Sequence, residues 1–303
     1  MGDIKKIGFI GLGVMGGPMA LNMLKKGSEE VIVYDISAEL MKKYTEQGLT
    51  AAASYADISK CDVIFLSLPD GEIVKKVLFS PGGVYDNLKT GQIVVDLSTI
   101  KYSTTIEIDK KLKEKGVKFL DAPVSGMAAR AVDGDLAIMC GGEEDVFDKI
   151  RPFFDRVGTS VVYMGKIGSG QLMKLINQLL FNINVAGMAE ILPFALKMGL
   201  DPEKTVAIVN SGTGRSFASE FFAPRALQSN FQDGYPLEDA YKDMQSASEI
   251  SASHNLPLPV LNAATITYQM ALLKGHGKQN KGSMIHVYED LFNVEFRAPK
   301  KKD

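Results

Sequence analysis

The sequence predicts an α/β fold with a doubly wound, mostly parallel sheet, followed by an all-α C-terminal domain that a long interdomain helix joins to it. Short β-rich runs alternate with helical stretches in the first half, and strand patterns vanish near residue 165. At 303 residues the chain is too long for one ordinary core. We therefore expect two domains, over residues 1–164 and 165–303.

Seven short β-rich runs define the first domain. Most are continuous apolar stretches, which is typical of strands covered by helices on both faces of a sheet. The runs are Ile7–Ile10, Val31–Tyr34, Val63–Leu68, Ile93–Leu97, Lys118–Leu120, Leu136–Cys140 and Val161–Tyr163. Helices are expected over Met15–Lys26, Ala38–Gln47, Glu72–Leu78, Ser103–Glu114 and Glu143–Arg156. Ser37 and Ser103 are candidate N-caps for two of these helices.

The second domain shows helical patterns only. From Ser169 to Met198 the sequence predicts one helix of about 30 residues, roughly 45 Å long. Gly199 is suited to end it, and Asp201-Pro202 to cap and start the next helix. Further helices are expected over Pro202–Asn210, Ser216–Ala226, Pro236–His254, Pro259–Lys274 and Ser283–Phe292.

Composition excludes several classes of function. The formal net charge of −2 gives no basic excess to neutralise a nucleic-acid backbone, and the run Lys300–Lys302 is expected to be a solvated tail. No stretch approaches about 20 uninterrupted apolar residues, so we expect no membrane span. The two cysteines, Cys61 and Cys140, lie in apolar runs and are expected to be buried thiols in a cytoplasmic or similarly reducing compartment. The histidines show no metal-ligand spacing, so no metal is expected.

A glycine-rich turn predicts a dinucleotide site. Gly11-Leu12-Gly13-Val14-Met15-Gly16 directly follows the strand Ile7–Ile10 and opens a helix, which is the context that a G-x-G-x-x-G pattern requires. Gly11 permits the tight turn, Gly13 lets the backbone approach a pyrophosphate, and Gly16 allows close packing of helix on strand. A flexible glycine-rich turn is the alternative interpretation.

Asp35 supplies the acidic partner of this turn. It ends the second predicted strand, 19 positions after Gly16. A carboxylate there accepts hydrogen bonds from the ribose hydroxyls and repels a 2′-phosphate, so we expect NAD rather than NADP. An ordinary turn aspartate at a strand end is the other interpretation.

Lys174, Asn177 and Gln178 share one face of the long predicted helix, because their spacing is i, i+3, i+4. The residues between and after them are apolar, so this part of the helix is expected to be buried nearly all round. A buried lysine needs a partner or a task, and desolvation lowers a lysine pKa toward the range useful for proton transfer. Alternatively, its stem packs and its amine reaches water.

Two further segments carry polar residues. Asp121-Ala122-Pro123-Val124-Ser125-Gly126 follows a predicted strand, where small residues leave backbone N–H groups available for an anion and Ser125 adds a hydroxyl donor. Lys242-Asp243-Met244 lies in a predicted helix and by itself is typical of a solvated face.

Taken in order, these segments resemble the motifs of the β-hydroxyacid dehydrogenase family, which includes 3-hydroxyisobutyrate dehydrogenase and tartronate semialdehyde reductase. Phe9–Ala20 with Asn22 is similar to the family's cofactor signature, and Asp121–Gly126 to its substrate segment. Gly168-x-Gly170-x-x-x-Lys174-x-x-Asn177 is similar to its catalytic helix, and Lys242–Met244 to its fourth signature. The resemblance covers essentially the whole chain and implies a Rossmann-type domain and a homodimer or homotetramer.

The resemblance also implies roles for individual residues. Lys174 is the expected general acid/base, with Ser125, Gly126 and the adjacent Met127 at the substrate carboxylate and Asn177 or Gln178 orienting the substrate. The expected cofactor contacts are Gly11, Leu12, Gly13, Val14, Met15, Gly16, Asp35, Leu68, Pro69, Thr99 and Lys242. The implied reaction is hydride transfer between NAD(H) and a small hydroxy acid, as in 3-hydroxyisobutyrate dehydrogenase.

One departure limits what the resemblance implies about the substrate. The family usually has a second glycine after the serine-glycine pair, and Met127 stands there. Arg215 is a candidate for binding a second acidic group of the substrate, with a loop-surface arginine as the alternative.

The competing functions are a semialdehyde, glyoxylate or tartronate semialdehyde reductase of the same family, an imine reductase, and a non-catalytic dinucleotide-binding regulator. The small carboxylate itself is the expected partner.

Overall fold

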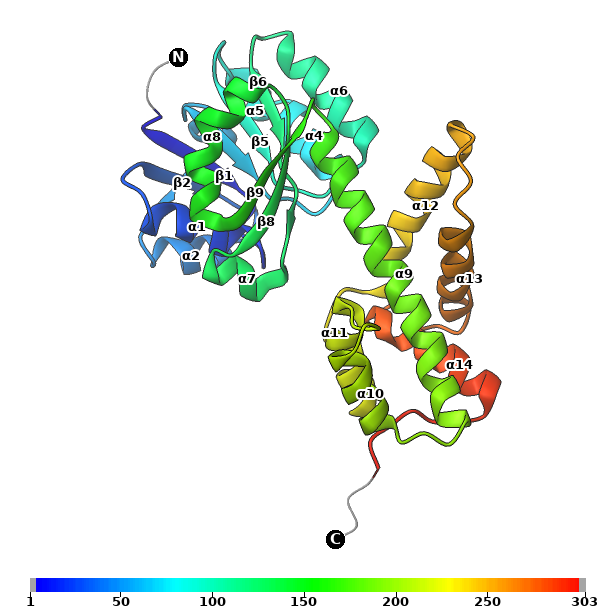
Figure 1. Cartoon of the computed structure of the whole chain (residues 1–303). Coiled ribbons are helices and arrows are strands. Elements are labelled where there is room, and N and C mark those ends of the chain that lie inside the picture. The colour runs from blue at the N-terminus through cyan, green and yellow to red at the C-terminus, as the bar shows by residue number, and fades with distance from the viewer. Residues whose placement is uncertain (1–3, 300–303) are drawn as a thin grey trace. The chain divides into compact units, whose positions relative to one another are not determined.

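The computed structural model describes residues 4–299, so the run Lys300–Lys302 lies outside the described residues. The chain divides into two compact units, residues 1–174 and 175–303. The first unit contains every strand of the described chain, and the second is helical, as the sequence predicts (Figure 1).

A nine-stranded sheet forms the first unit, in the order β3-β2-β1-β4-β5-β6-β8-β7, with β9 beside β8. The strands are β1 (Lys6–Ile10), β2 (Glu30–Tyr34), β3 (Thr50–Ala51), β4 (Val63–Leu66), β5 (Ile93–Asp96), β6 (Lys118–Asp121), β7 (Val124–Ser125), β8 (Leu136–Gly141) and β9 (Gly158–Gly165). Most neighbours are parallel, whereas β8 runs antiparallel to β6 and β7. The order reverses at β1, which lies between β2 and β4. Ligands of open parallel sheets bind at such a reversal, outside the carboxyl ends of the strands.

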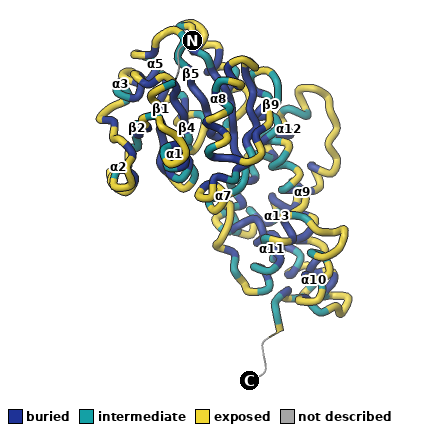
Figure 2. The backbone as a smooth tube through the Cα atoms, turned by 60° about the vertical axis from the view of Figure 1, so that its left-hand side comes forward, coloured by how far each residue is buried: buried dark blue, intermediate teal, exposed yellow. Residues whose placement is uncertain are grey.

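Helices cover both faces of this sheet. The helices of the first unit are α1 (Gly16–Lys25), α2 (Ala38–Thr45), α3 (Tyr55–Ile58), α4 (Gly71–Phe79), α5 (Val84–Asn87), α6 (Tyr102–Lys113), α7 (Met127–Asp133) and α8 (Glu144–Val157). One apolar core joins the sheet to α1 and α8, and a second core on the other face joins it to α4 and α6. The central strands β1, β4, β5 and β6 are accordingly buried, as the dark blue tube of Figure 2 shows.

The structure confirms one of the two predicted N-caps. Ser37 caps α2 as expected, because its Oγ accepts a hydrogen bond from the Leu40 N–H. The N-cap prediction for Ser103 is wrong, since α6 already begins at Tyr102 with Lys101 at the cap position. The short elements β3, β7, α3, α5 and α7 have too few residues to show a period in the sequence.

The second unit packs its helices around a separate apolar core. Its elements are the greater part of α9 (Ser169–Lys197), α10 (Pro202–Ser211), α11 (Phe217–Leu227), α12 (Leu237–Ser253), α13 (Pro259–Leu273), the short 3-10 helix η1 (Lys281–Met284) and α14 (Ile285–Phe292). The helix α9 is long and apolar enough to cross a membrane by length and composition, a property that core helices of soluble proteins share. Its side chains are less buried than expected: Ile176 is 49% exposed and Leu180 is 59% exposed.

Candidate active site

The loop after β1 has the geometry of a dinucleotide-binding turn. Gly11 has a φ of +94°, and a Cβ there would lie 2.2 Å from the Ser67 carbonyl oxygen. A Cβ on Gly16 would lie 2.0 Å from the Gly11 carbonyl oxygen, so this glycine allows α1 to start against the turn. In front of Gly13 the space is open, since a Cβ there would have no described atom within 4 Å. The loop therefore presents bare backbone at the start of α1, where a pyrophosphate is stabilised.

Asp35 is held rigidly beside this turn. Its Oδ2 accepts a hydrogen bond of 2.7 Å from the Leu12 N–H, and its Oδ1 accepts one of 2.8 Å from the Ser37 N–H. These two bonds join the end of β2 to the glycine turn. They fix the carboxylate in one orientation at the wall of a cavity.

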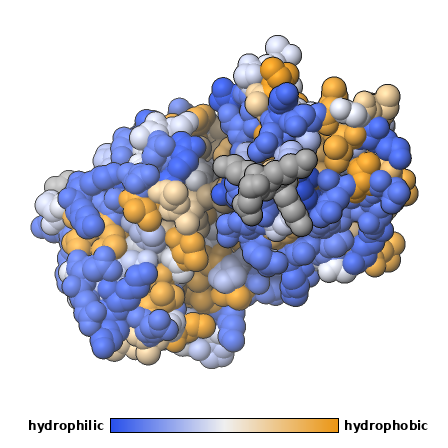
Figure 3. All heavy atoms as spheres, turned by 90° about the horizontal axis from the view of Figure 1, so that it is seen from below, coloured by the Kyte–Doolittle hydropathy of each residue, from blue (hydrophilic) through white to orange (hydrophobic). Residues whose placement is uncertain are grey.

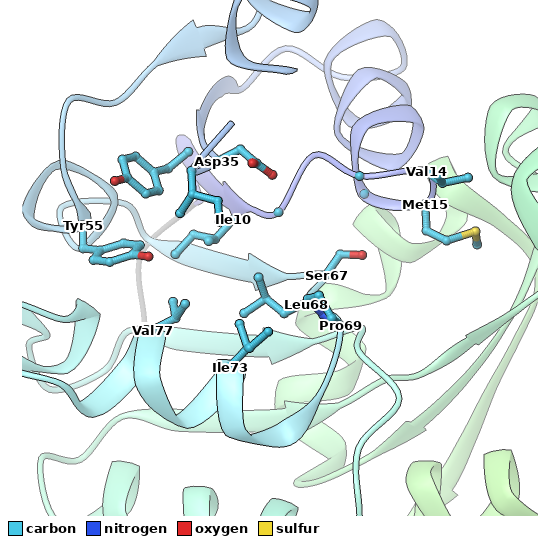
Figure 4. A pocket seen from close by; sticks show the side chains of 15 residues that line it. Ile10, Val14, Met15, Asp35, Tyr55, Ser67, Leu68, Pro69, Ile73 and Val77 are labelled. Atoms are coloured by element: carbon cyan, nitrogen blue, oxygen red, sulfur yellow. The ribbon is translucent and has the colours of Figure 1, made fainter. Parts of the chain in front are cut away.

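This cavity, of about 380 Å³, is lined by the glycine turn, by Asp35 and by the loop after β4. Tyr55 lies at one end, and Val14 and Met15 lie at the other (Figure 4). The Tyr55 end has apolar walls, including Ile73 and Val77. Leu68 and Pro69, both expected cofactor contacts, also line the cavity. An apolar slot beside a fixed carboxylate suits an adenine ring next to its ribose.

At the carboxyl edge of the sheet, the loop after β4 is hydrogen-bonded to the loop after β5. The Leu68 N–H donates to Ser98 Oγ at 2.9 Å, and the Ser98 N–H donates to Asp96 Oδ1 at 2.9 Å. Thr99 follows at once and is exposed. The expected cofactor residues Leu68 and Thr99 therefore lie on neighbouring loops.

Asp121 connects the sheet to the start of α9. Its Oδ1 accepts from the Gly168 N–H at 2.6 Å, and its Oδ2 accepts from the Gln171 N–H at 2.8 Å. Burial raises the pKa of Asp121 to about 6, although these backbone donors lower it. Burial also raises the pKa of the nearby Asp96 to about 7, and the charge of Asp121 adds to this increase. The first turn of α9 is thus fixed to the end of β6 through the buried carboxyl group of Asp121.

Lys174 lies one turn further along α9. The residue is 8% exposed, and its Nζ donates a 2.8 Å hydrogen bond to the Val124 carbonyl oxygen. Val124 precedes Ser125 in β7, which pairs with β8. The structure therefore brings the expected general acid/base next to the expected carboxylate-binding segment, although Lys174 and Val124 are 50 positions apart.

The segment after Ser125 has an unusual backbone. Gly126 has a φ of +147°, and Met127 has a φ of +63°. The latter is the left-handed region, which costs a non-glycine residue roughly 1–2 kcal/mol. Met127 thus adopts a conformation that favours glycine, and its side chain is 42% exposed at the start of α7. The chain tolerates this cost beside the expected carboxylate-binding segment.

The other expected substrate residues lie in the second unit. Asn177 and Gln178 are half-buried on α9, and Gln178 Nε2 donates to Asp243 Oδ2 at 3.4 Å. Lys242 is exposed and forms a 2.7 Å ion pair with Asp239. Of the residues 4–299, no three His, Cys, Asp or Glu side chains are grouped as a metal site.

Arg215, the candidate for a second acidic group, forms a 2.7 Å ion pair with Glu220. Both side chains are largely exposed, at 63% and 41%. The arrangement is that of a surface ion pair, which contributes little to stability.

Gln171 and Lys281 are among the buried polar residues for which no role was predicted from the sequence. Gln171 is 3% exposed, and Lys281 in the second unit is fully buried with its Nζ 2.8 Å from Asn182 Oδ1. Gln171 could have been noticed from its spacing, since it lies three positions before Lys174. Lys281 has no such local pattern, because its partner is 99 positions away.

Comparison with known proteins gives matches along most of the chain. A family model described as the NAD binding domain of 6-phosphogluconate dehydrogenase matches residues 6–165. A second, described as NAD-binding of NADP-dependent 3-hydroxyisobutyrate dehydrogenase, matches residues 168–288.

Individual relatives agree with these models. The chain is 37% identical over 291 residues to 2-(hydroxymethyl)glutarate dehydrogenase of Eubacterium barkeri, covering 95% of this chain and 96% of the relative. It is 34% identical over 292 residues to mitochondrial 3-hydroxyisobutyrate dehydrogenase of Mus musculus, covering 94% and 87%. The crystal structure of 3-hydroxyisobutyrate dehydrogenase from Salmonella typhimurium matches with a TM-score of 0.83 at 27% identity, covering 93% of this chain and 99% of that one.

Proposed function

Since the chain belongs to the β-hydroxyacid dehydrogenase family that includes 3-hydroxyisobutyrate dehydrogenase, we propose that it oxidises a small 3-hydroxy acid with NAD at the carboxyl edge of its sheet. The enzyme is an NAD(P)-dependent oxidoreductase. One observation carries our assignment of the site: the Lys174 amine is anchored on the Val124 carbonyl oxygen, one residue before Ser125.

The residues at the sheet edge fit a dinucleotide. The open space at Gly13 admits a pyrophosphate, the apolar end of the cavity admits adenine, and the Asp35 carboxylate faces the same cavity. When bound, the nicotinamide would accept hydride during oxidation and supply it during reduction. Thr99 and Leu68, on the loops after β5 and β4, are the residues we assign to the nicotinamide end.

Lys174 is the proton-transfer group in this proposal. As the neutral amine, it takes the proton of the substrate hydroxyl while the hydrogen on the same carbon leaves as hydride. In the reverse direction, the ammonium form donates that proton to the carbonyl oxygen. Ser125 Oγ and the backbone N–H of Gly126 hold the carboxylate of the substrate. Fixing one end of the substrate orients its reacting carbon and so lowers the entropic part of the barrier.

Met127 favours small or unbranched acids over bulky ones in this proposal. Its half-exposed side chain stands directly after the carboxylate-binding segment, where the family usually has a glycine with no side chain. A substrate panel of 3-hydroxyisobutyrate, 3-hydroxypropionate, glycerate, hydroxybutyrates and threonate, with the matching semialdehydes, compares branched with unbranched acids. It should also contain 2-(hydroxymethyl)glutarate, on which the Eubacterium barkeri relative is named to act.

Cofactor choice gives the clearest test of this function. With NAD(H) and NADP(H) compared on that panel, we expect kcat/KM to be at least about tenfold higher for NAD(H), because Asp35 repels a 2′-phosphate. Replacing Asp35 by Ser should reduce that preference. The absorbance of the reduced cofactor measures both rates. Equal or better use of NADP(H) by the wild type would contradict the role of Asp35, and no turnover of any panel member would contradict the function.

We also propose that the enzyme forms a homodimer or homotetramer through α9. Large apolar side chains are exposed along this helix, and only 39% of its most apolar window is buried. They are Ile176, Leu180, Ile191, Phe194 and Met198. Apolar patches interrupt the polar surface also on the face drawn in Figure 3. Extended apolar surface of this kind marks protein interfaces, and most oligomers are symmetric assemblies of one chain.

Light scattering tests this assembly. We expect a mass of at least twice the 32.9 kDa of one chain, and a shift toward that single-chain mass when Phe194 is replaced by Glu. A wild-type mass of one chain at micromolar concentration would contradict the proposal.

We place the enzyme in the cytoplasm or a similarly reducing compartment, since Cys61 and Cys140 are both buried thiols. Recovery in a secreted fraction of cells would contradict that placement.

A further inference from the structure

Gln171 grips the backbone on both sides of Thr99. Its Nε2 donates a 2.7 Å hydrogen bond to the Ser98 carbonyl oxygen, and its Oε1 accepts a 3.1 Å hydrogen bond from the Ile100 N–H. The side chain is buried, with 3% of the residue exposed. A carboxamide offers one donor and one acceptor in a fixed plane, so it can bind two peptide groups that flank a single residue.

The backbone of Gln171 is itself held in place by a hydrogen bond. The Gln171 N–H donates to Asp121 Oδ2 at 2.8 Å, which fixes this turn of α9 to the end of β6. Lys174 lies three positions later, so both side chains lie on neighbouring parts of one helix face. Gln171 reaches the loop after β5, while Lys174 reaches Val124 in β7. One helical turn of α9 therefore contacts both the loop that we assign to the nicotinamide and the strand β7 that precedes the carboxylate-binding residues.

We propose that Gln171 is a positioning residue that sets Thr99 relative to the Lys174 amine. This inference rests on the proposed function, in which Thr99 contacts the nicotinamide end of the cofactor and Lys174 the substrate hydroxyl. Loops at a strand end are mobile unless their backbone is bonded, and small displacements at a reacting centre can cost about 10²-fold in rate. Gln171 acts through Thr99 and touches neither cofactor nor substrate.

The test replaces Gln171 by Met, which has a similar length but bonds neither peptide group. We expect kcat to fall by roughly tenfold or more, with the Kd of NADH changed less than about threefold, because the adenine end of the cavity is untouched. In the Thr99→Ala background, Gln171→Met should lower kcat much less, since the side chain through which Gln171 acts is already absent.

A matched control lies at the other end of β5, the strand that leads to the Thr99 loop. Gln92 immediately precedes β5, and its Nε2 donates to the Ser59 and Cys61 carbonyl oxygens at 2.7 Å and 2.6 Å. Its Oε1 also accepts from the Lys89 N–H at 2.5 Å, so Gln92→Met loses three hydrogen bonds of a glutamine side chain to backbone, one more than Gln171→Met. We expect a comparable decrease in Tm for Gln92→Met and Gln171→Met, and a decrease in kcat for Gln171→Met alone.

The outcomes separate this inference from the proposed function. If Gln171→Met keeps kcat within about twofold of the wild type while Lys174→Met is inactive, the inference is wrong and the function stands. If Gln92→Met loses as much kcat as Gln171→Met, or if the Thr99→Ala background leaves the loss unchanged, the role of Gln171 is only structural and the inference is again wrong. If Lys174→Met is active, the proposed function itself fails.

If Gln171→Met does not fold, Gln171→Asn replaces it in the test. Asn keeps a polar group in place but is too short to form both hydrogen bonds, so we expect the same decrease in kcat.

Discussion

Replacing Lys174 by Met is expected to lower kcat by about 10²-fold or more, a typical magnitude for removing a general acid/base. Met keeps the length and apolar stem of the side chain, so the packing around α9 is largely retained. What disappears is the amine that donates to the Val124 carbonyl oxygen at 2.8 Å and, in our proposal, exchanges a proton with the substrate. The Kd of NADH should stay close to the wild-type value, because the cavity is built by other loops.

The control for this variant is Lys166→Met, which removes an exposed lysine from the loop just before α9. We expect kcat of Lys166→Met within about twofold of the wild type, as for surface substitutions in general. Steady-state rates on the best substrate of the panel measure both variants. Turnover by Lys174→Met near the wild-type rate would show that another group transfers the proton.

Replacing Asp96 by Asn is expected to raise stability at alkaline pH. Asp96 is fully buried, and among residues 4–299 its Oδ2 has no hydrogen-bond partner. Burial raises the pKa of Asp96 from 3.8 to about 7, so the folded chain binds this proton more tightly than the unfolded chain. The resulting stabilisation is complete below about pH 4 and is lost as the pH rises through about 7. Since one pKa unit corresponds to about 1.4 kcal/mol, the loss amounts to at most about 4 kcal/mol.

Asn keeps the acceptor for the Ser98 N–H and carries no charge at any pH. Urea unfolding of the wild type and of Asp96→Asn at pH 5 and pH 8 measures the effect. We expect the variant to gain in free energy of unfolding relative to the wild type on going from pH 5 to pH 8. Asp148→Asn, which removes an exposed carboxylate from α8, should show no such gain. An identical pH dependence of the wild type and Asp96→Asn would contradict a buried, proton-binding Asp96.

The sequence predicts most of the fold and much of the candidate site because those features are local. The turn from Gly11 to Gly16 requires a strand before it and a helix after it, and Asp35 ends the next strand along. Lys174 is conspicuous as a charged residue among apolar neighbours on one helix. Met127 stands where the family usually has a glycine, and the structure gives it a φ of +63°, a value that was not predicted from the sequence.

What could not be predicted depends on contacts between distant parts of the chain. Gln171 forms a hydrogen bond with Ser98, which lies 73 positions away in the sequence. Asp121 accepts hydrogen bonds at the start of α9 from residues that lie 47 and 50 positions away. A glutamine or an aspartate has no pattern that names such a partner. The expected burial of α9 is wrong for a related reason: an apolar residue such as Leu180 is buried only where another element covers it.

A crystal structure with NAD and the preferred hydroxy acid bound tests the central claim most directly. We predict the Lys174 Nζ within hydrogen-bonding distance of the substrate hydroxyl, the substrate carboxylate on Ser125 Oγ and the Gly126 N–H, and the pyrophosphate at Gly13. An ordered substrate whose hydroxyl lies beyond the reach of the Lys174 amine would contradict the account.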